Sequence, residues 1–135
     1  MSFTDSLIEE FRANQGIVTR PYPDSTLVLL TIRGARSGRE RTLPIEYMED
    51  SGNLYVFATA GGAPKHPPWY HNVRANPEVT VEYGIERYPA VAHEIRGAER
   101  DRLWNELVRR KPRFKEYETK TSRIFPVFRL DRAGD

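Results

Sequence analysis

The chain has 135 residues and no cysteine, and its 21 Lys and Arg against 19 Asp and Glu give a formal net charge of +2. That length suits one domain, and the missing cysteines exclude disulfides, thiol nucleophiles, thiolate zinc sites and iron–sulfur clusters. With 39% hydrophobic and 30% charged residues the composition is that of a folded chain. Its longest aliphatic run, residues 27–30, is too short to span a bilayer.

Apolar residues near the N-terminus recur at helical spacing. Phe3, Leu7, Ile8 and Phe11 fall on one stripe, which predicts a short helix from about residue 5 to 14 with Thr4 as a candidate N-cap. The net charge of −2 on this helix disfavours an anionic lipid surface, so we expect it to dock on the protein body. Peripheral membrane contact stays open. The first five residues have no signal-peptide pattern, and we expect a cytoplasmic protein.

Apolar runs and alternating patterns predict about six strands, mostly joined as hairpins, and two further helices in one domain spanning residues 1–135. The run 26–32 is apolar throughout, so both of its faces should be covered, and Pro44 predicts a strand edge or a bulge. We therefore predict a mainly β fold, an antiparallel barrel with peripheral helices. The strands are expected at 26–32, 42–48, 54–58, 78–83, 88–95 and 124–130, and the helices at 69–75 and 98–110.

The usual catalytic constellations are missing from the sequence. His66 and His71 are five residues apart, which does not place both on one helical face, and no acid completes a ligand set, so we expect no metal site. Ser37 lacks the spacing of a hydrolase nucleophile, and neither a P-loop nor a dinucleotide-binding fingerprint is present. If the chain is an enzyme, a bound cofactor must supply the reactivity.

Two basic segments suggest an anionic partner. Residues 33–41 hold four arginines and one acid around two glycines, a composition suited to binding a phosphate. Residues 109–123 hold seven basic residues and two acids, with Phe114 and Tyr117 on one helical face. Trp69 and Tyr70 at a predicted helix start could hold the edge of a planar ring, although a tryptophan packed in the core explains the same pattern.

These residues resemble the deazaflavin-dependent nitroreductase and quinone reductase family. Three blocks, in the same order, carry the resemblance from about residue 26 to 130: Arg33-x-Gly-Ala-Arg36-Ser37-Gly38-x-x-Arg41-Thr42-x-Pro44, then Gly61-Gly62-Ala63-Pro64-x-x-Pro67-x-Trp69-Tyr70-His71-Asn72-x-x-Ala75-Asn76-Pro77, then Glu116-Tyr117-x-x-Lys120-Thr121-x-Arg123-x-x-Pro126-Val127.

The resemblance implies a split β-barrel related to the FMN-binding barrels. It also implies an actinobacterial oxidoreductase that transfers a hydride from reduced 8-hydroxy-5-deazaflavin, coenzyme F420, to a quinone or a nitroaromatic compound. That cofactor carries a phosphodiester and an oligoglutamate tail, which suits the local positive charge.

Site residues follow from the resemblance by position. It implies that Tyr117, as a hydrogen-bond or proton donor, and Phe114 border the substrate. The implied cofactor-binding residues hold the acidic tail, border the ring or form the helix start; they are Arg36, Ser37, Arg41, Thr42, Leu43, Pro44, Ile45, Ala58, Thr59, Ala60, Pro68, Trp69, Tyr70, His71 and Asn72.

Three positions depart from the family pattern. Ala35 stands where members often carry arginine, Ala60 where a longer polar or basic side chain is usual, and Phe114 where the nitroimidazole-reducing member has tyrosine. Two other functions stay open: an FMN-binding barrel, and a small barrel that grips single-stranded nucleic acid, although aromatics clustered in loops and helices argue against the latter. We expect a monomer or a homodimer and no nucleic-acid partner.

Overall fold

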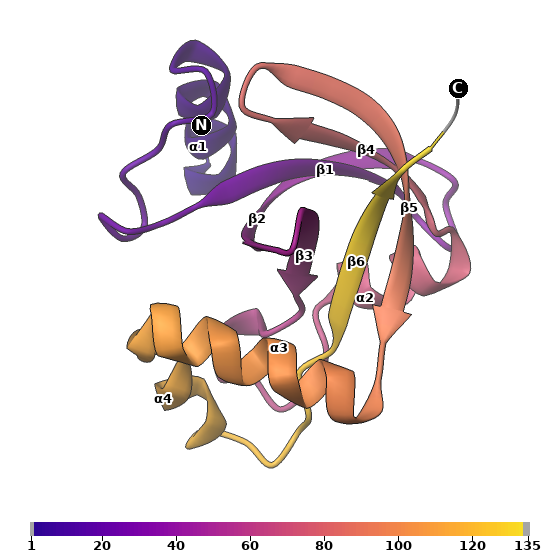
Figure 1. The fold of residues 1–135 in the computed structure, drawn as a ribbon. Coiled ribbons are helices and arrows are strands. Elements are labelled where there is room, and N and C mark those ends of the chain that lie inside the picture. The colour runs from indigo at the N-terminus through magenta and orange to yellow at the C-terminus, as the bar shows by residue number, and fades with distance from the viewer. Residues whose placement is uncertain (1, 134–135) are drawn as a thin grey trace.

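The computed structural model describes residues 2–133, so Met1 and residues 134–135 of the predicted domain lie outside the described part. Within it, antiparallel strands close into a barrel in the order β1-β2-β3-β6-β5-β4, as the resemblance implied (Figure 1). The strands are β1 (Leu27–Arg33), β2 (Glu40–Asp50), β3 (Asn53–Phe57), β4 (Glu78–Tyr83), β5 (Glu86–Ile95) and β6 (Val127–Arg132). The helices are α1 (Phe3–Ala13), α2 (Pro68–Ala75), α3 (Gly97–Arg110) and α4 (Lys115–Glu118).

The predicted elements are confirmed, with shifts of a few residues at their ends. The strand expected from residue 124 begins only at Val127, after Pro126, which lacks the N–H that a ladder needs. Two 3₁₀ turns, Ala60–Gly62 and Pro112–Phe114, precede α2 and α4. Within residues 2–133 there is no helix of the length and apolar character that crossing a membrane demands.

Strand β1 is covered on both faces, as its continuous apolar run predicted. Val28, Leu30 and Ile32 point into the barrel core, where they join buried side chains from the other strands. Leu27 and Leu29 point outward and pack against Leu7 and Phe11 of α1 and against Val18. Helix α1 therefore docks on the outside of the barrel, as expected from its apolar stripe.

The N-cap expected at Thr4 is wrong. Helix α1 begins at Phe3, and the Ser2 hydroxyl accepts the backbone N–H of Asp5 over 3.0 Å. Ser2 and Thr4 both have cap-forming side chains, and the cap lies two residues earlier than expected because Phe3 and Thr4 already belong to the helix. At its other end α1 is tied to the barrel by an ion pair from Arg12 to Glu82 of β4, 2.9 Å long.

Pro44 lies at a local edge of the sheet, as its residue type predicted. Strand β2 pairs with β1 from Glu40 to Glu46, with Pro44 opposite Leu29. It pairs with β3 only from Tyr47 to Asp50. In the described structure one side of β2 is therefore without a strand partner at Leu43 to Ile45, and that opening is where the cavities described below begin.

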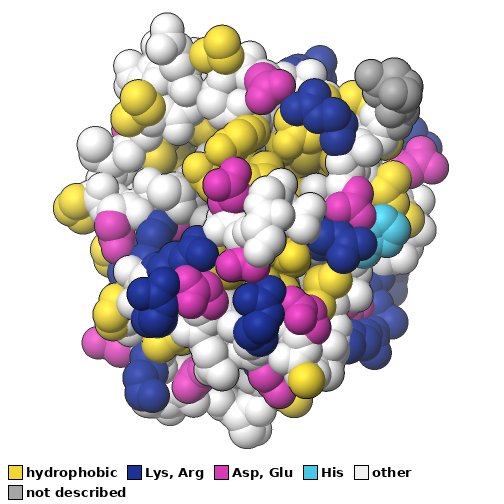
Figure 2. Space-filling model, viewed as in Figure 1, with side chains coloured by type: hydrophobic (Ala, Val, Ile, Leu, Met, Phe, Trp, Pro, Cys, Tyr) yellow, Lys and Arg dark blue, Asp and Glu magenta, His cyan; other side chains and the backbone are white. Residues whose placement is uncertain are grey.

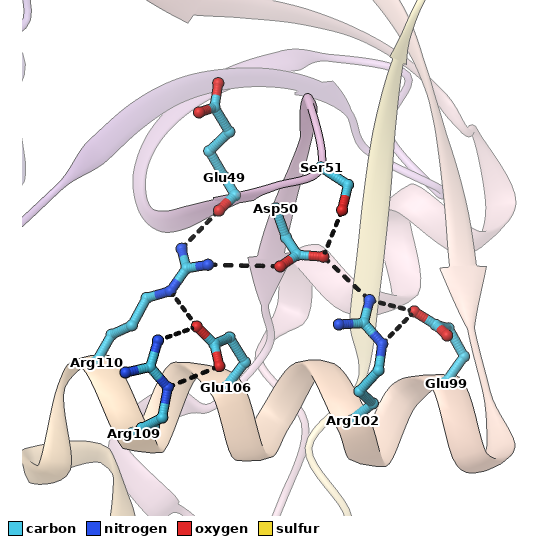
Figure 3. A network of polar contacts seen from close by, with 8 residues as sticks. All are labelled: Glu49, Asp50, Ser51, Glu99, Arg102, Glu106, Arg109 and Arg110. Atoms are coloured by element: carbon cyan, nitrogen blue, oxygen red, sulfur yellow. Dashed lines mark hydrogen bonds and ion pairs between the residues drawn. The ribbon is translucent and has the colours of Figure 1, made fainter.

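Helix α3 crosses one end of the barrel and is fixed there by apolar and ionic contacts. Leu103, Trp104 and Leu107 are buried against β3, β6 and the start of α4. On the outer side of α3, Lys and Arg alternate with Asp and Glu over the surface (Figure 2). Figure 3 shows Arg102 and Arg110 reaching from α3 to Asp50 in the β2–β3 hairpin, with oxygen–nitrogen distances of 3.0 and 3.4 Å. The helix thereby carries the following residues, 112–117, to the mouth of the opening beside β2.

Candidate active site

The arginine-rich turn between β1 and β2 has a defined shape. The N–H of Gly34 donates to the carbonyl of Arg39 over 2.8 Å, and Gly38 adopts a left-handed φ of +71° that favours glycine. The hydroxyl oxygen of Ser37 accepts the backbone N–H of Arg39 at 3.1 Å, which leaves the hydroxyl proton free to donate. The turn thus presents a hydroxyl donor between the arginines on either side of it.

Two asparagines of helix α2 and its C-cap hold this turn in place. The side-chain oxygen of Asn72 accepts the backbone N–H of Ala35 over 3.0 Å. The amide of Asn76 donates to the carbonyl of Arg33 over 3.4 Å. Asn72, expected to form part of a cradle at the helix start, is therefore also a link that fixes the distance between α2 and the turn.

A cavity of about 620 Å³, here called the cofactor cavity, opens between the turn and the start of α2. Arg36 and Arg41 line it, and neither forms an ion pair with another side chain in residues 2–133. Two arginines facing one cavity without acidic partners repel each other unless an anion lies between them. The full lining is Ile32, Gly34, Ala35, Arg36, Ser37, Arg41, Leu43, Pro68, Trp69, His71 and Asn72.

A second cavity of about 330 Å³, here called the acceptor cavity, adjoins the first. The two share Leu43 and Trp69, so a flat molecule held in one can present its edge to the other. Trp69 is only partly buried, and its ring centroid lies 5.9 Å from that of Phe128 in the barrel core. The acceptor cavity is lined by Phe3, Thr4, Leu7, Pro21, Tyr22, Leu27, Leu43, Pro44, Ile45, Glu46, Thr59, Trp69, Arg113, Phe114 and Tyr117.

Tyr117 and Phe114 meet at one wall of the acceptor cavity. Their ring centroids are 5.4 Å apart with an interplanar angle of 82°, an edge-to-face contact that holds both rings. Burial raises the pKa of Tyr117 above its ordinary value, and nearby Tyr22 raises it further, whereas Arg113 acts in the opposite direction. The phenol is therefore protonated at neutral pH and can donate a hydrogen bond.

A carboxylate network supports the same wall. Glu46 of β2 accepts from the backbone N–H and the hydroxyl of Thr26, at 3.1 and 2.7 Å, and forms a short ion pair with Lys111. Its other oxygen accepts from Arg113 over 3.2 Å. These contacts join β2 to the segment after α3, some 65 residues away.

Arg123 fixes the loop that carries Thr59. Its guanidinium donates to the carbonyls of Ala58, Thr59 and Ala63, at 3.1, 2.6 and 2.9 Å. It also contacts Nδ1 of His66 at 2.7 Å. A side chain at Gly62 would be strained, because φ is +85° and a Cβ there would lie only 3.1 Å from the carbonyl oxygen of Tyr117. Arg123 and Gly62 together set the position of the loop against the acceptor wall.

The two cavities gather most of the residues that the resemblance implied. Tyr70 is the clear exception, because it is buried in the barrel core and its hydroxyl donates to Glu94 over 3.2 Å, beside a different cavity. Thr42 bonds to Thr31 in β1 over 2.8 Å, and Ala58 is fully buried with its N–H donated to Pro126. Ala60 is exposed with a left-handed φ of +48°. These four line neither cavity.

His66 and His71 come closer than their spacing indicates. Because His66 lies in the loop before α2 and not on it, the two ring centroids are 6.1 Å apart. Within residues 2–133, even so, no group of three His, Asp or Glu side chains could hold a metal ion.

Comparison with known proteins assigns the chain to a family. A family model described as F420H2-dependent quinone reductase matches residues 6–131. The chain belongs to this family. An F420H2-dependent quinone reductase of Mycobacterium tuberculosis is 32% identical over 126 residues, which cover 90% of this chain and 85% of that protein.

Solved structures agree with this assignment. An F420H2-dependent reductase is 43% identical with a TM-score of 0.70, and the match covers 78% of this chain and 93% of that one. A protein described as a domain-swapped dimer is 38% identical with a TM-score of 0.72, covering 94% of this chain and 98% of that one. As an F420H2-dependent reductase, the chain is an oxidoreductase whose cofactor is coenzyme F420, as the sequence resemblance implied.

The described residues suit that cofactor. The unpaired Arg36 and Arg41 and the Ser37 hydroxyl are donors for a phosphodiester and for carboxylates. Trp69 and Leu43, shared by both cavities, offer flat and apolar surface for a ring.

Sequence reasoning missed two parts of the candidate site. Helix α1 and the segment after it line the acceptor cavity through Phe3, Leu7 and Tyr22, although the helical stripe indicated only docking. Arg113 and Glu46 were not candidates, because their pairing joins distant parts of the chain and leaves no local pattern. The excess of basic residues over 109–123 was the one available signal for Arg113.

Proposed function

We propose that the cofactor cavity binds F420 and that the acceptor cavity binds the quinone, so that hydride passes where Trp69 and Leu43 border both. The observation that carries this assignment is that Arg36 and Arg41, which have no acidic partner among residues 2–133, line a cavity that adjoins the aromatic acceptor cavity. When bound, the cofactor supplies a hydride to the acceptor.

Arg36, Arg41 and Ser37 bind the anionic part of the cofactor. Guanidinium groups make charge-assisted hydrogen bonds to phosphate and carboxylate oxygens, and the Ser37 proton adds a third donor. Asn72 and Asn76 hold the turn against α2 and so keep these donors at a fixed distance from Trp69. Binding the tail in this way orients the ring toward the acceptor cavity.

Tyr117 acts on the acceptor. Hydride transfer to a quinone leaves negative charge on an oxygen, and a hydrogen-bond donor aimed at that oxygen stabilises the transition state. The raised pKa of Tyr117 keeps its proton in place at neutral pH, so it can donate it or hydrogen-bond with it. Solvent returns the proton to the phenol after turnover. Phe114 cannot donate and provides an apolar wall.

Binding and turnover of the purified protein test the proposal. We would titrate it with F420, FMN and a single-stranded oligonucleotide, each at two salt concentrations, and then follow reoxidation of F420H2 with menadione and with a nitroaromatic compound. We expect saturable F420 binding that weakens with salt, since part of the attraction is between exposed charges. Reoxidation should depend on enzyme and acceptor. Tight FMN binding with no F420 binding would overturn the assignment.

The same proposal extends to acceptor range, assembly and location. A nitroaromatic compound presents an oxygen that gains charge in the same way, so we infer that it is reduced in the same cavity. We infer a cytoplasmic monomer or homodimer. The solved structure described as a domain-swapped dimer makes a homodimer of this chain worth testing by light scattering.

Peripheral membrane contact through α1 is tested by sedimentation of the protein with lipid vesicles.

A further inference from the structure

Arg113 contacts two aromatic rings at the acceptor wall. Its guanidinium carbon lies 4.1 Å from the ring centroid of Tyr22 and 4.5 Å from that of Phe114. A guanidinium that lies over two rings and also bonds carboxylates cannot turn away without losing several of these contacts. The group therefore has a fixed orientation at the edge of the cavity that it lines.

Two of its three nitrogens are already bonded to carboxylates. Nε donates to Asp24 over 3.2 Å, and Nη2 donates to Glu46 over 3.2 Å. Glu46 is in turn held by Lys111 and Thr26, so this anchor does not move with Arg113. Nη1, the third nitrogen, has no carboxylate partner within residues 2–133. The guanidinium also lies close enough to Tyr117 for a hydrogen bond from Arg113 to lower the pKa of the phenol. The Arg113 side chain is only 21% exposed.

We propose that Arg113 supplies a second hydrogen-bond donor in the acceptor cavity, where its Nη1 and the Tyr117 hydroxyl together bind the acceptor oxygen that becomes negative. This inference rests on the proposed function of the cavity. Hydride transfer adds two electrons and one hydrogen to the quinone and leaves an oxyanion. One proton from Tyr117 completes the hydroquinone, and solvent then returns a proton to the phenol. Arg113 stays protonated throughout, because a guanidinium does not give up its proton in proteins.

A purely structural role for Arg113 would look different in two respects. An arginine whose role is only to link Asp24 to Glu46 of β2 would not have to line the cavity. It would also not need a third nitrogen without a carboxylate partner. A second donor also compensates for the low dielectric of a cavity walled by Leu7, Leu27 and Phe114, where a developing oxyanion is poorly solvated.

The test uses Arg113→Ala with free guanidinium as the added probe. Removing the side chain leaves space beside Tyr22 and Phe114 that a guanidinium ion can enter, with Asp24 and Glu46 still present to bind it. We expect kcat with menadione to fall roughly 10- to 100-fold, as for loss of one transition-state donor while another remains. Affinity for F420, measured by its fluorescence, should be unchanged. Low-millimolar guanidinium should restore a large part of kcat, and sodium chloride at equal ionic strength should not.

Arg109→Ala is the matched control. Arg109 lies on α3, where Glu106 is its one side-chain partner among residues 2–133, and it lines neither cavity, so its removal should leave kcat unaltered with or without guanidinium. A wild-type kcat in Arg113→Ala would overturn the inference. So would a reduced kcat that guanidinium does not restore, because that pattern indicates a structural role.

A second variant covers the case in which Arg113→Ala does not fold. Lysine at this position keeps the charge, but its three donors sit on one compact ammonium and cannot replace the separate positions of Nε, Nη2 and Nη1 in the planar guanidinium. We therefore expect Arg113→Lys to fold, to bind F420 normally and to lose at least several-fold in kcat, and a wild-type kcat would overturn the inference. Failure of the wild-type protein itself to oxidise F420H2 would instead overturn the proposed function.

Discussion

Arg36 and Arg41 approach the cofactor cavity from the two sides of one turn, and their contribution is open to measurement. Losing a charge-assisted contact costs about 1.5–3 kcal/mol, so Arg36→Ala and Arg41→Ala should each weaken F420 binding roughly 10- to 100-fold. Fluorescence titration measures the dissociation constants.

Arg39→Ala serves as the control for both variants. Arg39 belongs to the same turn and carries the same charge but does not line the cavity, so its removal should change the affinity only slightly. Equal losses in all three variants would mean that the turn attracts the cofactor by its total charge and not through directed contacts.

Tyr117 is the residue whose hydroxyl should matter to the chemical step alone. We expect Tyr117→Phe to lower kcat roughly 10-fold or more with unchanged F420 affinity, because it removes one transition-state hydrogen bond and keeps the ring against Phe114. Steady-state kinetics with menadione and a nitroaromatic compound measure it. Tyr83→Phe, on β4, is the control because Tyr83 lines neither cavity. Wild-type rates in Tyr117→Phe would mean that water delivers the proton.

At the scale of elements, the loop of residues 58–63 depends on one side chain. Arg123 donates three hydrogen bonds to its carbonyls. In Arg123→Met the Thr59 carbonyl still accepts the N–H of Gly62, whereas the carbonyls of Ala58 and Ala63 lose their donor at a cost of about 1–3 kcal/mol each. We expect a loss of roughly 3 kcal/mol or more, which lowers Tm by about 6–12 °C. Differential scanning calorimetry checks it.

Arg123→Met should affect binding of the quinone and binding of F420 differently, because the loop of residues 58–63 and the turn of residues 34–39 border different cavities. Thr59 borders the acceptor cavity only, so KM for the quinone should rise while F420 affinity stays within about twofold. A variant with normal Tm, or one that loses F420 affinity and acceptor affinity alike, would contradict this division.

Elements were predictable from the sequence where the signal is local. The continuous apolar run of β1 and the alternation in β4 follow from which faces each strand buries, and Gly38 marks the turn that needs a left-handed φ. Tyr70 shows the limit. It is adjacent to Trp69 on α2, but a helix turns by about 100° per residue, so one ring faces the cavities and the other the core. Which of the two rings faces the cavities depends on how α2 docks on the barrel, and the sequence does not show that.

For the whole molecule, the stability should depend on pH through His66. Burial, followed by the charge of Arg123, holds the pKa of His66 below its ordinary value near 6.5. The folded state thus binds fewer protons than the unfolded state as the pH falls below about 6.5, so stability is fully present above that pH and is lost as the pH drops toward the folded pKa. We expect Tm to decline as the pH falls below about 6.5.

His66→Asn isolates this effect. The asparagine oxygen can accept the bond from Arg123 but does not titrate, so Tm of the variant should stay nearly constant over the same pH range. Hydrogen bonds from arginines lower the pKa values of three glutamates, Glu10, Glu99 and Glu106. Their contribution to the stability of the folded state is lost only below about pH 4.5, so it does not affect the change in Tm expected from His66. Parallel declines in wild type and variant, measured by thermal scans, would assign the dependence to other groups.

The whole-molecule contacts that complete the site were beyond reach of the sequence. Glu46 meets Arg113 and Lys111 only because the barrel closes and α3 crosses its end, and nothing in residues 40–50 indicates a distant basic partner. The same holds for α1, whose Phe3 and Leu7 become acceptor-cavity walls through docking. Local sequence patterns determine which face of a strand or helix is buried and where a turn lies. The walls of a cavity depend instead on elements that come together only when the barrel closes.

The division of the site into two cavities that share only Leu43 and Trp69 has a consequence for how such an enzyme diversifies. Walls exclusive to the acceptor come from residues 3–27, 44–46, 59 and 113–117, and walls exclusive to the cofactor come from residues 32–41, 68 and 71–72. Mutations in the first set, apart from the proposed donors Arg113 and Tyr117, can therefore accumulate and alter which oxidant is accepted while selection for the electron donor holds the second set constant. A directed-evolution library confined to residues 3–27 and 114, with both donors kept, is the economical route to a reductase for a new oxidant.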